Sequence, residues 1–222
     1  MCGRFRQTSS AETIARAFNL TNVPPQKPQY NIAPTQTIAT VVSSSPEGKR
    51  EFRELRWGLI PSWAKEQKIG AKLINARAET VAEKPSFRSA FRKRRCLIIA
   101  NGFYEWQNQK GEKQPFCIQR KDEQIFAFAG LWEGWQAPEG KSIESCTIIT
   151  TEANEIMAPI HKRMPVILNS QDYHLWLDRK ITAKEQLQPL LVPYDSKVMK
   201  VYPVSKKVNN PRNSFPFQQI DI

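Results

Sequence analysis

The residues whose types could carry chemistry begin with Cys2, which directly follows the initiator Met1. We expect Met1 to be removed in the cell, because the residue that follows it is small. Cys2 would then carry a free α-amine and a thiol two carbons apart. Their reference pKa values are about 7.7–8.0 and about 8.5, so both groups have reactive fractions near pH 7. Such an aminothiol can attack a carbonyl through its sulfur, or capture an aldehyde as an imine that closes to a thiazolidine. The alternative is a disordered start in which Met1 is kept.

Glu105 and His161 are the candidates for proton transfer. Glu105 lies between Phe103, Tyr104 and Trp106 in a strand-like run, where partial desolvation would suit a carboxylate to proton transfer. Strand alternation could instead point Glu105 toward solvent. His161 ends a predicted helix before a basic and apolar segment, and histidine titrates near neutrality. A structural or surface role for His161 is the alternative.

Asn75 and Arg77 lie two residues apart, so in an extended segment they share a face. An amide can orient an amine or a carbonyl, and an arginine can bind a phosphate through two donors. An ordinary helix cap beside a surface arginine would give the same pattern. Trp63 lies in a proline-containing loop and could stack on a nucleobase, which is worth about 1–3 kcal/mol per base. A buried loop tryptophan is equally compatible with the sequence.

The remaining cysteines give no sign of a metal site. Cys96, Cys117 and Cys146 lie in apolar, strand-like runs without metal-ligand spacing, and we interpret them as core residues in a reducing cytosol. The chain has only two histidines, so a multi-histidine metal site is excluded. We therefore expect neither a metal nor a cofactor.

Composition and charge are those of a soluble globular protein with a basic surface. The 222 residues include 33 Lys and Arg against 21 Asp and Glu, a formal net charge of +12, which suits a polyanionic partner. A merely basic protein is the alternative. The densest cluster of positive charge comprises Arg88, Arg92, Lys93, Arg94 and Arg95. No apolar run of about 18 residues and no secretory signal is present, so we expect a cytoplasmic protein that does not span a membrane.

Hydrophobic periodicity predicts many short strands with peripheral helices. A capping box at 9–12 predicts a helix to about residue 18, and a hairpin is expected across the turn at 46–49. We further expect helices at about 80–94 and 154–160, and one buried strand over 97–106. These elements predict a single α+β domain over 1–222, built on a mainly antiparallel, barrel-like sheet, with 206–222 as a loop-like tail.

Six blocks of the chain, taken together, resemble the SOS-response-associated peptidase family, also called abasic-site processing proteins. They are MCGRF at 1–5, YNIAP at 30–34, WGLIPSW at 57–63, NARAET at 75–80, GFYEW at 102–106 and HKRMP at 161–165. The blocks occur in the family order and span most of the chain. The resemblance implies a compact α+β fold around a barrel-like antiparallel sheet.

The resemblance also implies an activity and a set of residues. Members of the family covalently trap abasic sites in single-stranded DNA as part of the DNA damage response. The match makes Cys2 the cross-linking residue, with Asn75, Glu105 and His161 as the catalytic set around it. Contacts to DNA would come from Arg4, Arg77, Arg163, Trp63 and Phe87. We expect a monomer, nucleoid-associated if bacterial, that reverses the cross-link and has weak abasic-site lyase and self-cleaving peptidase activity.

Two other functions are compatible with parts of the pattern. An N-terminal-nucleophile amidohydrolase would use the Cys2 sulfur to attack a glutamine-type amide, and glutaminase activity would reveal it. A non-covalent single-strand binding module would keep its behaviour when Cys2 is replaced by alanine. The amidohydrolase accounts for Cys2 but not for the charge, nor for Glu105 and His161.

Overall fold

The computed structural model describes residues 2–45, 48–137 and 139–221. Its centre is a ring of five strands, in which β10 pairs with β4, β4 with β3, β3 with β6, β6 with β9, and β9 again with β10. The ring closes a small barrel, as expected from the sequence. The barrel strands are β3 (Thr37–Ser43), β4 (Arg50–Trp57), β6 (Arg95–Ala100), β9 (Phe126–Gln136) and β10 (Ser142–Glu152).

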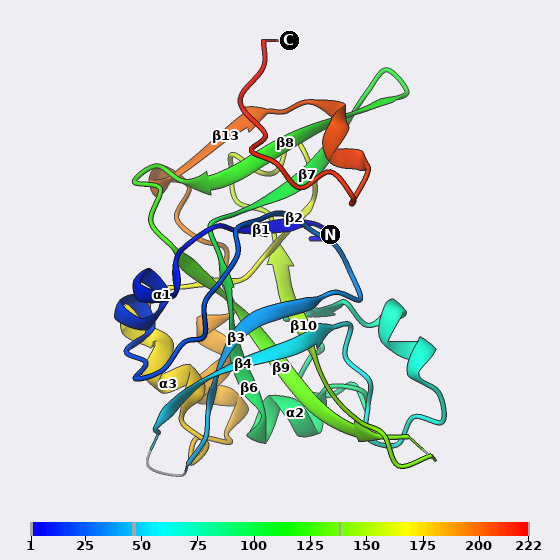
Figure 1. Cartoon of the computed structure of the whole chain (residues 1–222), viewed down its shortest axis with the longest axis vertical. Coiled ribbons are helices and arrows are strands. Elements are labelled where there is room, and N and C mark those ends of the chain that lie inside the picture. The colour runs from blue at the N-terminus through cyan, green and yellow to red at the C-terminus, as the bar shows by residue number, and fades with distance from the viewer. Residues whose placement is uncertain (1, 46–47, 138, 222) are drawn as a thin grey trace.

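A second sheet lies across one end of this barrel (Figure 1). It is antiparallel throughout and runs in the order β13–β8–β7–β1–β2. Its strands are β1 (Phe5–Gln7), β2 (Gln29–Ile32), β7 (Gly102–Gln109), β8 (Glu112–Arg120) and β13 (Met199–Pro203). Three short strands extend the barrel: β5 (Asn75–Arg77) and β11 (Arg163–Pro165) pair with β10, and β12 (Ile167–Leu168) pairs with β9.

Two apolar clusters hold these layers together. One joins the barrel strands to the second sheet. In it the centre of the Phe5 ring lies 5.2 Å from that of Trp57 and 5.8 Å from that of Phe128, and both pairs pack edge to face. The other lies between the barrel and the peripheral helices. Those helices are α1 (Ala11–Phe18), α2 (Arg88–Lys93), α3 (Tyr173–Leu177) and α4 (Lys184–Leu187), with 3-10 turns η1 (Gln67–Lys72), η2 (Ser170–Asp172), η3 (Gln188–Leu190), η4 (Ser196–Val198) and η5 (Lys206–Asn209).

The hairpin predicted from the sequence is confirmed as β3 and β4, although residues 46 and 47 of its turn lie outside the described residues. The predicted helix at 80–94 is wrong over most of its length. Only α2 forms, because Pro85 disfavours helical backbone at the residue before it. The predicted helix at 154–160 is a series of turns that ends near Pro159, with the Asn154 side chain accepting a hydrogen bond from Met157 N.

The strand predicted over 97–106 is two strands in two different sheets. The chain leaves the barrel after Ala100 and enters the second sheet at Gly102. Asn101 makes this corner, where its Oδ1 accepts from Thr8 N at 2.8 Å and its main-chain N donates to Arg6 O. The N-cap of α1 is Ser10 and not Ser9, since Ser10 Oγ accepts from Thr13 N while Ser9 bonds to Asn101.

The basic cluster seen in the sequence is partly internal. Arg95 is 3% exposed and donates to five main-chain carbonyls, which ties β6 to α2 and to the end of α3. Burial lowers the pKa of Arg95 to about 10. Arg94 pairs with Glu133 at 2.6 Å. These two positive charges therefore stabilise the fold and contribute little to a surface for polyanions.

Two glycines bring the loop after β4 against the segment that leads to β5. A Cβ built on Gly70 would lie 2.5 Å from Gly58 O, and one on Gly58 would lie 2.6 Å from Gly70 O. Leu73 and Ile74 follow directly, and Ile74 O accepts from Trp57 Nε1 at 2.9 Å. This close approach fixes the position of the main chain just before Asn75, where β5 begins.

We predict that Gly70→Ala destabilises the protein by about 1–3 kcal/mol, because the added methyl must displace main chain. Urea unfolding followed by tryptophan fluorescence would measure the change. Gly134→Ala is the matched control, since a Cβ at Gly134 meets nothing within 4 Å. Equal stability of the two variants would contradict the packing argument.

Candidate functional site

Cys2 lies at the junction of the barrel and the second sheet. Its side chain is fully buried, in the same apolar cluster as Phe5, Trp57 and Ile148. Burial raises the pKa of the Cys2 thiol well above its ordinary value, and the negative charge of Glu105 raises it further. Burial thus opposes ionisation of this sulfur in the chain that retains Met1, and the alternative of a disordered start does not hold at residue 2.

Asn75 reaches Cys2 from the other side of the fold. β5 runs parallel to β10, with Asn75 opposite Ile148, and this pairing fixes the direction of the side chain. Asn75 Nδ2 donates to Cys2 O at 2.8 Å. Its Oδ1 is buried and has no hydrogen-bond partner among the described residues. The amide group of Asn75 thus holds the main chain of residue 2 through Nδ2, and its Oδ1 is left as a hydrogen-bond acceptor next to residue 2.

Glu105 approaches from β7. It is 3% exposed and lies opposite Phe116 in the β7–β8 ladder, so the solvent-facing alternative is wrong. β7 also pairs with β1, where Phe103 is opposite Phe5 and Tyr104 N donates to Arg4 O at 2.9 Å. This pairing brings β7 alongside the start of the chain. Glu105 is therefore close enough to Cys2 for its negative charge to raise the pKa of the thiol.

His161 lies in the turn before β11 and is partly buried. Its Nδ1 is 3.0 Å from both the main-chain N and the main-chain O of Arg163. Depending on the tautomer, Nδ1 accepts from that N–H or donates to that carbonyl, and in both cases the contact fixes the orientation of the ring. Gln107 Nε2 donates to Pro159 O at 3.0 Å and ties the preceding turn to β7, two residues beyond Glu105.

Arg77 and Arg163 lie close together at the end of β10. Thr150 of β10 is opposite Arg77 in the pairing with β5 and opposite Pro165 in the pairing with β11. Arg163 forms a two-point ion pair with Glu79, at 2.7 and 3.1 Å, and donates to Thr150 O at 2.6 Å. The hydrogen bond from Arg163 lowers the pKa of Glu79. Arg77 is exposed, and sequence reasoning missed Glu79, although it lies within the 75–80 block.

Arg4 has a different environment from Arg163. Arg4 Nη1 donates to Asn31 Oδ1 at 2.8 Å and to Val208 O at 2.7 Å, and the guanidinium lies 5.8 Å from the centre of the Trp106 ring. Burial lowers the pKa of Arg4. The acceptors are neutral, and Arg4 makes no ion pair with a carboxylate in the part of the chain that the structure describes. Its positive charge is therefore not cancelled locally.

The two aromatic candidates differ in exposure. Trp63 is 59% exposed, so the buried alternative is wrong, and it borders a hollow of about 580 Å³ that is also lined by Lys65, Lys68 and Lys72. Glu66 lines the same hollow and pairs with Lys68 at 2.5 Å, so the exposed ring lies among mixed charges in which lysine is in excess. Such a surface is suited to a single-stranded nucleic acid. Phe87 is 5% exposed and packs in the core beneath the peripheral helices. A contact between Phe87 and DNA would therefore require the surrounding helices to move, and it stays a prediction.

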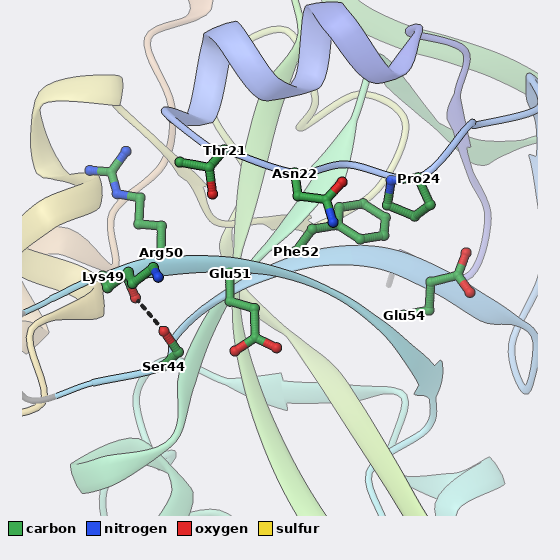
Figure 2. Close-up of a pocket in the computed structure, with 9 residues that line it drawn as sticks. All are labelled: Thr21, Asn22, Pro24, Ser44, Lys49, Arg50, Glu51, Phe52 and Glu54. Carbon is green, nitrogen blue, oxygen red and sulfur yellow. Dashed lines mark hydrogen bonds between the residues drawn. The ribbon is translucent and has the colours of Figure 1, made fainter.

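A further hollow, of about 420 Å³, lies between the connector after α1 and strand β4 (Figure 2). The Phe52 ring forms part of its wall, and the charges around it are mixed, with Lys49 and Arg50 opposed by Glu51 and Glu54. None of the candidate residues lines it. The hollow is therefore separate from the group of side chains around Cys2.

No group of histidine, cysteine, aspartate and glutamate residues in the described ranges could hold a metal ion. No helix in those ranges is both long enough and apolar enough to cross a bilayer.

Comparisons with known proteins agree with the fold and with the blocks in the sequence. A family model described as SOS response associated peptidase (SRAP) matches residues 1–211. The abasic site processing protein YoqW of Bacillus subtilis strain 168 is 48% identical over 220 residues, which covers 97% of each chain. The abasic site processing protein HMCES of Xenopus tropicalis is 34% identical, covering 86% of this chain and 65% of that protein. A crystal structure of a Bacteroides thetaiotaomicron protein matches with a TM-score of 0.86 at 30% identity, covering 96% of this chain and 97% of that one.

We predict that Cys2 in the chain that retains Met1 reacts slowly with iodoacetamide through pH 8. The reason is that only the thiolate reacts, and burial raises the pKa of the thiol. Peptide mass spectrometry after timed quenching would give the rate at each pH. The same sample in urea is the control, where Cys2 should react as an ordinary thiol. Rapid labelling of the folded protein at pH 7 would contradict this prediction.

Proposed function

The chain belongs to the SOS response associated peptidase family, and we propose that it processes abasic sites in single-stranded DNA by bonding to them through Cys2. The observation that carries the proposal is the convergence on residue 2 of two residues distant in sequence. Asn75 binds its carbonyl, and the charge of Glu105 acts on its thiol. Removal of Met1 would add a free α-amine at this point.

The first step uses the amine. The deoxyribose of an abasic site interconverts between a closed ring and an open aldehyde, and the Cys2 amine attacks C1′ of the open form. Loss of one water gives an imine. His161 transfers a proton at the sugar oxygen as the ring opens. Glu105 moves protons on the carbinolamine and stabilises the cationic iminium, while Asn75 holds residue 2 in line.

The second step uses the sulfur. The Cys2 thiol adds across the C=N bond, its sulfur bonding to C1′ and its proton passing to the nitrogen, so that a thiazolidine forms without net release of a proton. The step is intramolecular, and well-oriented intramolecular reactions reach effective molarities of about 10⁵–10⁸ M. The ring should therefore persist longer than a simple imine.

Binding and release follow from the same groups. The uncancelled charge of Arg4 and the exposed Arg77 and Trp63 would contact phosphates and bases, and so would Arg163, which lies near Arg77 at the end of β10. Glu105 and His161 could run the reaction backwards and free the DNA. An imine that fails to close could undergo β-elimination, which gives weak lyase activity, and self-cleavage before Cys2 would be the peptidase activity.

The decisive test is intact-mass spectrometry of the protein mixed with an oligonucleotide that carries one abasic site. We expect a species equal to protein without Met1 plus DNA minus one water, stable without borohydride. Cys2→Ala keeps the α-amine, so its adduct should require borohydride trapping. No adduct from protein shown to lack Met1 would overturn the proposal, and glutaminase activity in that sample would favour an amidohydrolase.

We predict that Glu105→Gln slows formation of the adduct by about 10²-fold or more, the usual contribution of a general acid–base group. A quenched time course on denaturing gels would give the rate constant at saturating DNA. Glu133→Gln is the control, because Glu133 is another buried carboxylate but lies on β9 and pairs with Arg94. Equal rates for Glu105→Gln and the parent would remove Glu105 from the mechanism.

A further inference from the structure

Asn31 connects the two ends of the chain. It lies on β2, is 3% exposed, and its Nδ2 donates to three main-chain carbonyls of the C-terminal segment: Val208 at 3.1 Å, Asn210 at 3.0 Å and Asn213 at 2.8 Å. Its Oδ1 accepts from Arg4 Nη1 at 2.8 Å. A single buried amide thus organises the segment at 206–213 and an arginine two residues from Cys2.

The C-terminal segment contacts Arg4 in two further ways. Val208 O accepts from Arg4 Nη1 at 2.7 Å. Asn209 Oδ1 accepts from Trp106 Nε1 at 2.7 Å, and the Trp106 ring lies beside the Arg4 guanidinium. The segment predicted as a loop-like tail is therefore packed against the start of the chain through η5 and the turns after it.

All of these acceptors are neutral, and this has an electrostatic consequence. A carboxylate beside Arg4 would cancel its charge, as Glu79 does for Arg163. Amide and main-chain oxygens fix the direction of the guanidinium and leave its full positive charge. A guanidinium remains protonated at neutral pH even when partly buried, so the charge persists.

We propose that Asn31 is a positioning residue, which uses the C-terminal segment to hold Arg4 as an uncancelled charge for a DNA phosphate beside the reactive residue. The inference rests on the proposed function. Asn31 acts through Arg4, and neither it nor the segment touches the reacting atoms. The main-chain pairing of Phe5 with Ile32, the residue after Asn31, keeps this contact in register with Cys2.

The test measures binding separately from the covalent step. The probe is a single-stranded oligonucleotide with a tetrahydrofuran abasic analogue, which has no aldehyde and cannot be cross-linked. We expect Asn31→Ala to weaken binding and to reduce the slope of log K against log salt by about 0.7, the loss of one phosphate contact on a single strand. The double variant Arg4→Ala/Asn31→Ala should bind as Arg4→Ala does, because the two residues act as one unit.

Ser214→Ala is the matched control. Ser214 directly follows the segment at 206–213, and its Oγ accepts from Tyr30 N at 3.2 Å. The variant therefore loosens the attachment of that segment without removing a group that bonds to Arg4, and its salt slope should equal that of the parent. If Asn31→Ala does not fold, Asn31→Asp decides. It keeps the size and the acceptor oxygen, loses the amide donors and adds a charge that cancels that of Arg4, so the same loss of slope is expected.

The outcomes separate the inference from the proposed function. If the parent protein neither binds the analogue nor forms an adduct with a true abasic site, the proposed function is contradicted. If the parent binds and a folded Asn31 variant keeps its slope, or if the losses in the double variant add, the positioning role is overturned. Failure of both Asn31→Ala and Asn31→Asp to fold would assign Asn31 a purely structural role and also overturn it.

Discussion

The burial of the first strand is the constraint on which the rest of the site depends. β1 pairs with β2 on one edge and β7 on the other, and Phe5 packs against Trp57 and Phe128 of the barrel. A chain start is ordinarily mobile, because few contacts repay the entropy of ordering it. Here the ladder and the aromatic contacts provide them, so residue 2 has one position. Asn75 and Glu105 can meet it only because that position is fixed.

The positive charges of the protein serve three different purposes. Arg95 is buried among main-chain carbonyls and holds helices to the barrel. Arg163 is balanced by Glu79 and joins β11 to the segment after β5. Among the described residues, the side chain of Arg4 donates to two neutral oxygens and to no carboxylate. A net charge of +12 therefore overstates the charge available for a polyanion, and the partners of each arginine decide which ones are available.

Much of the fold follows from local pattern, but the meeting of distant segments does not. The hairpin of β3 and β4 and the barrel-like, mainly antiparallel sheet follow from alternation and turn residues. The aromatic flanks of Glu105 indicated its burial, although strand alternation also allowed a solvent-facing side chain. The corner at Asn101 was not visible, because an apolar run is the same whether one sheet or two bury it. The role of Asn31 depends on a contact with Arg4, 27 residues away, and on contacts with the C-terminal segment, 177 to 182 residues away, which no local pattern encodes. The buried ring of Phe87 likewise depends on a cluster that gathers residues from distant parts of the chain.

The state of the Cys2 thiol argues for aldehyde chemistry over amide chemistry. An amidohydrolase would use the sulfur to attack an amide carbonyl, which is a weak electrophile, whereas burial and the charge of Glu105 raise the pKa of the Cys2 thiol in the chain that retains Met1. An aldehyde reacts readily with an amine, and the resulting imine accepts a neutral thiol with its proton. The apolar surroundings of residue 2 are thus consistent with a reaction in which the amine acts first and the sulfur closes the ring.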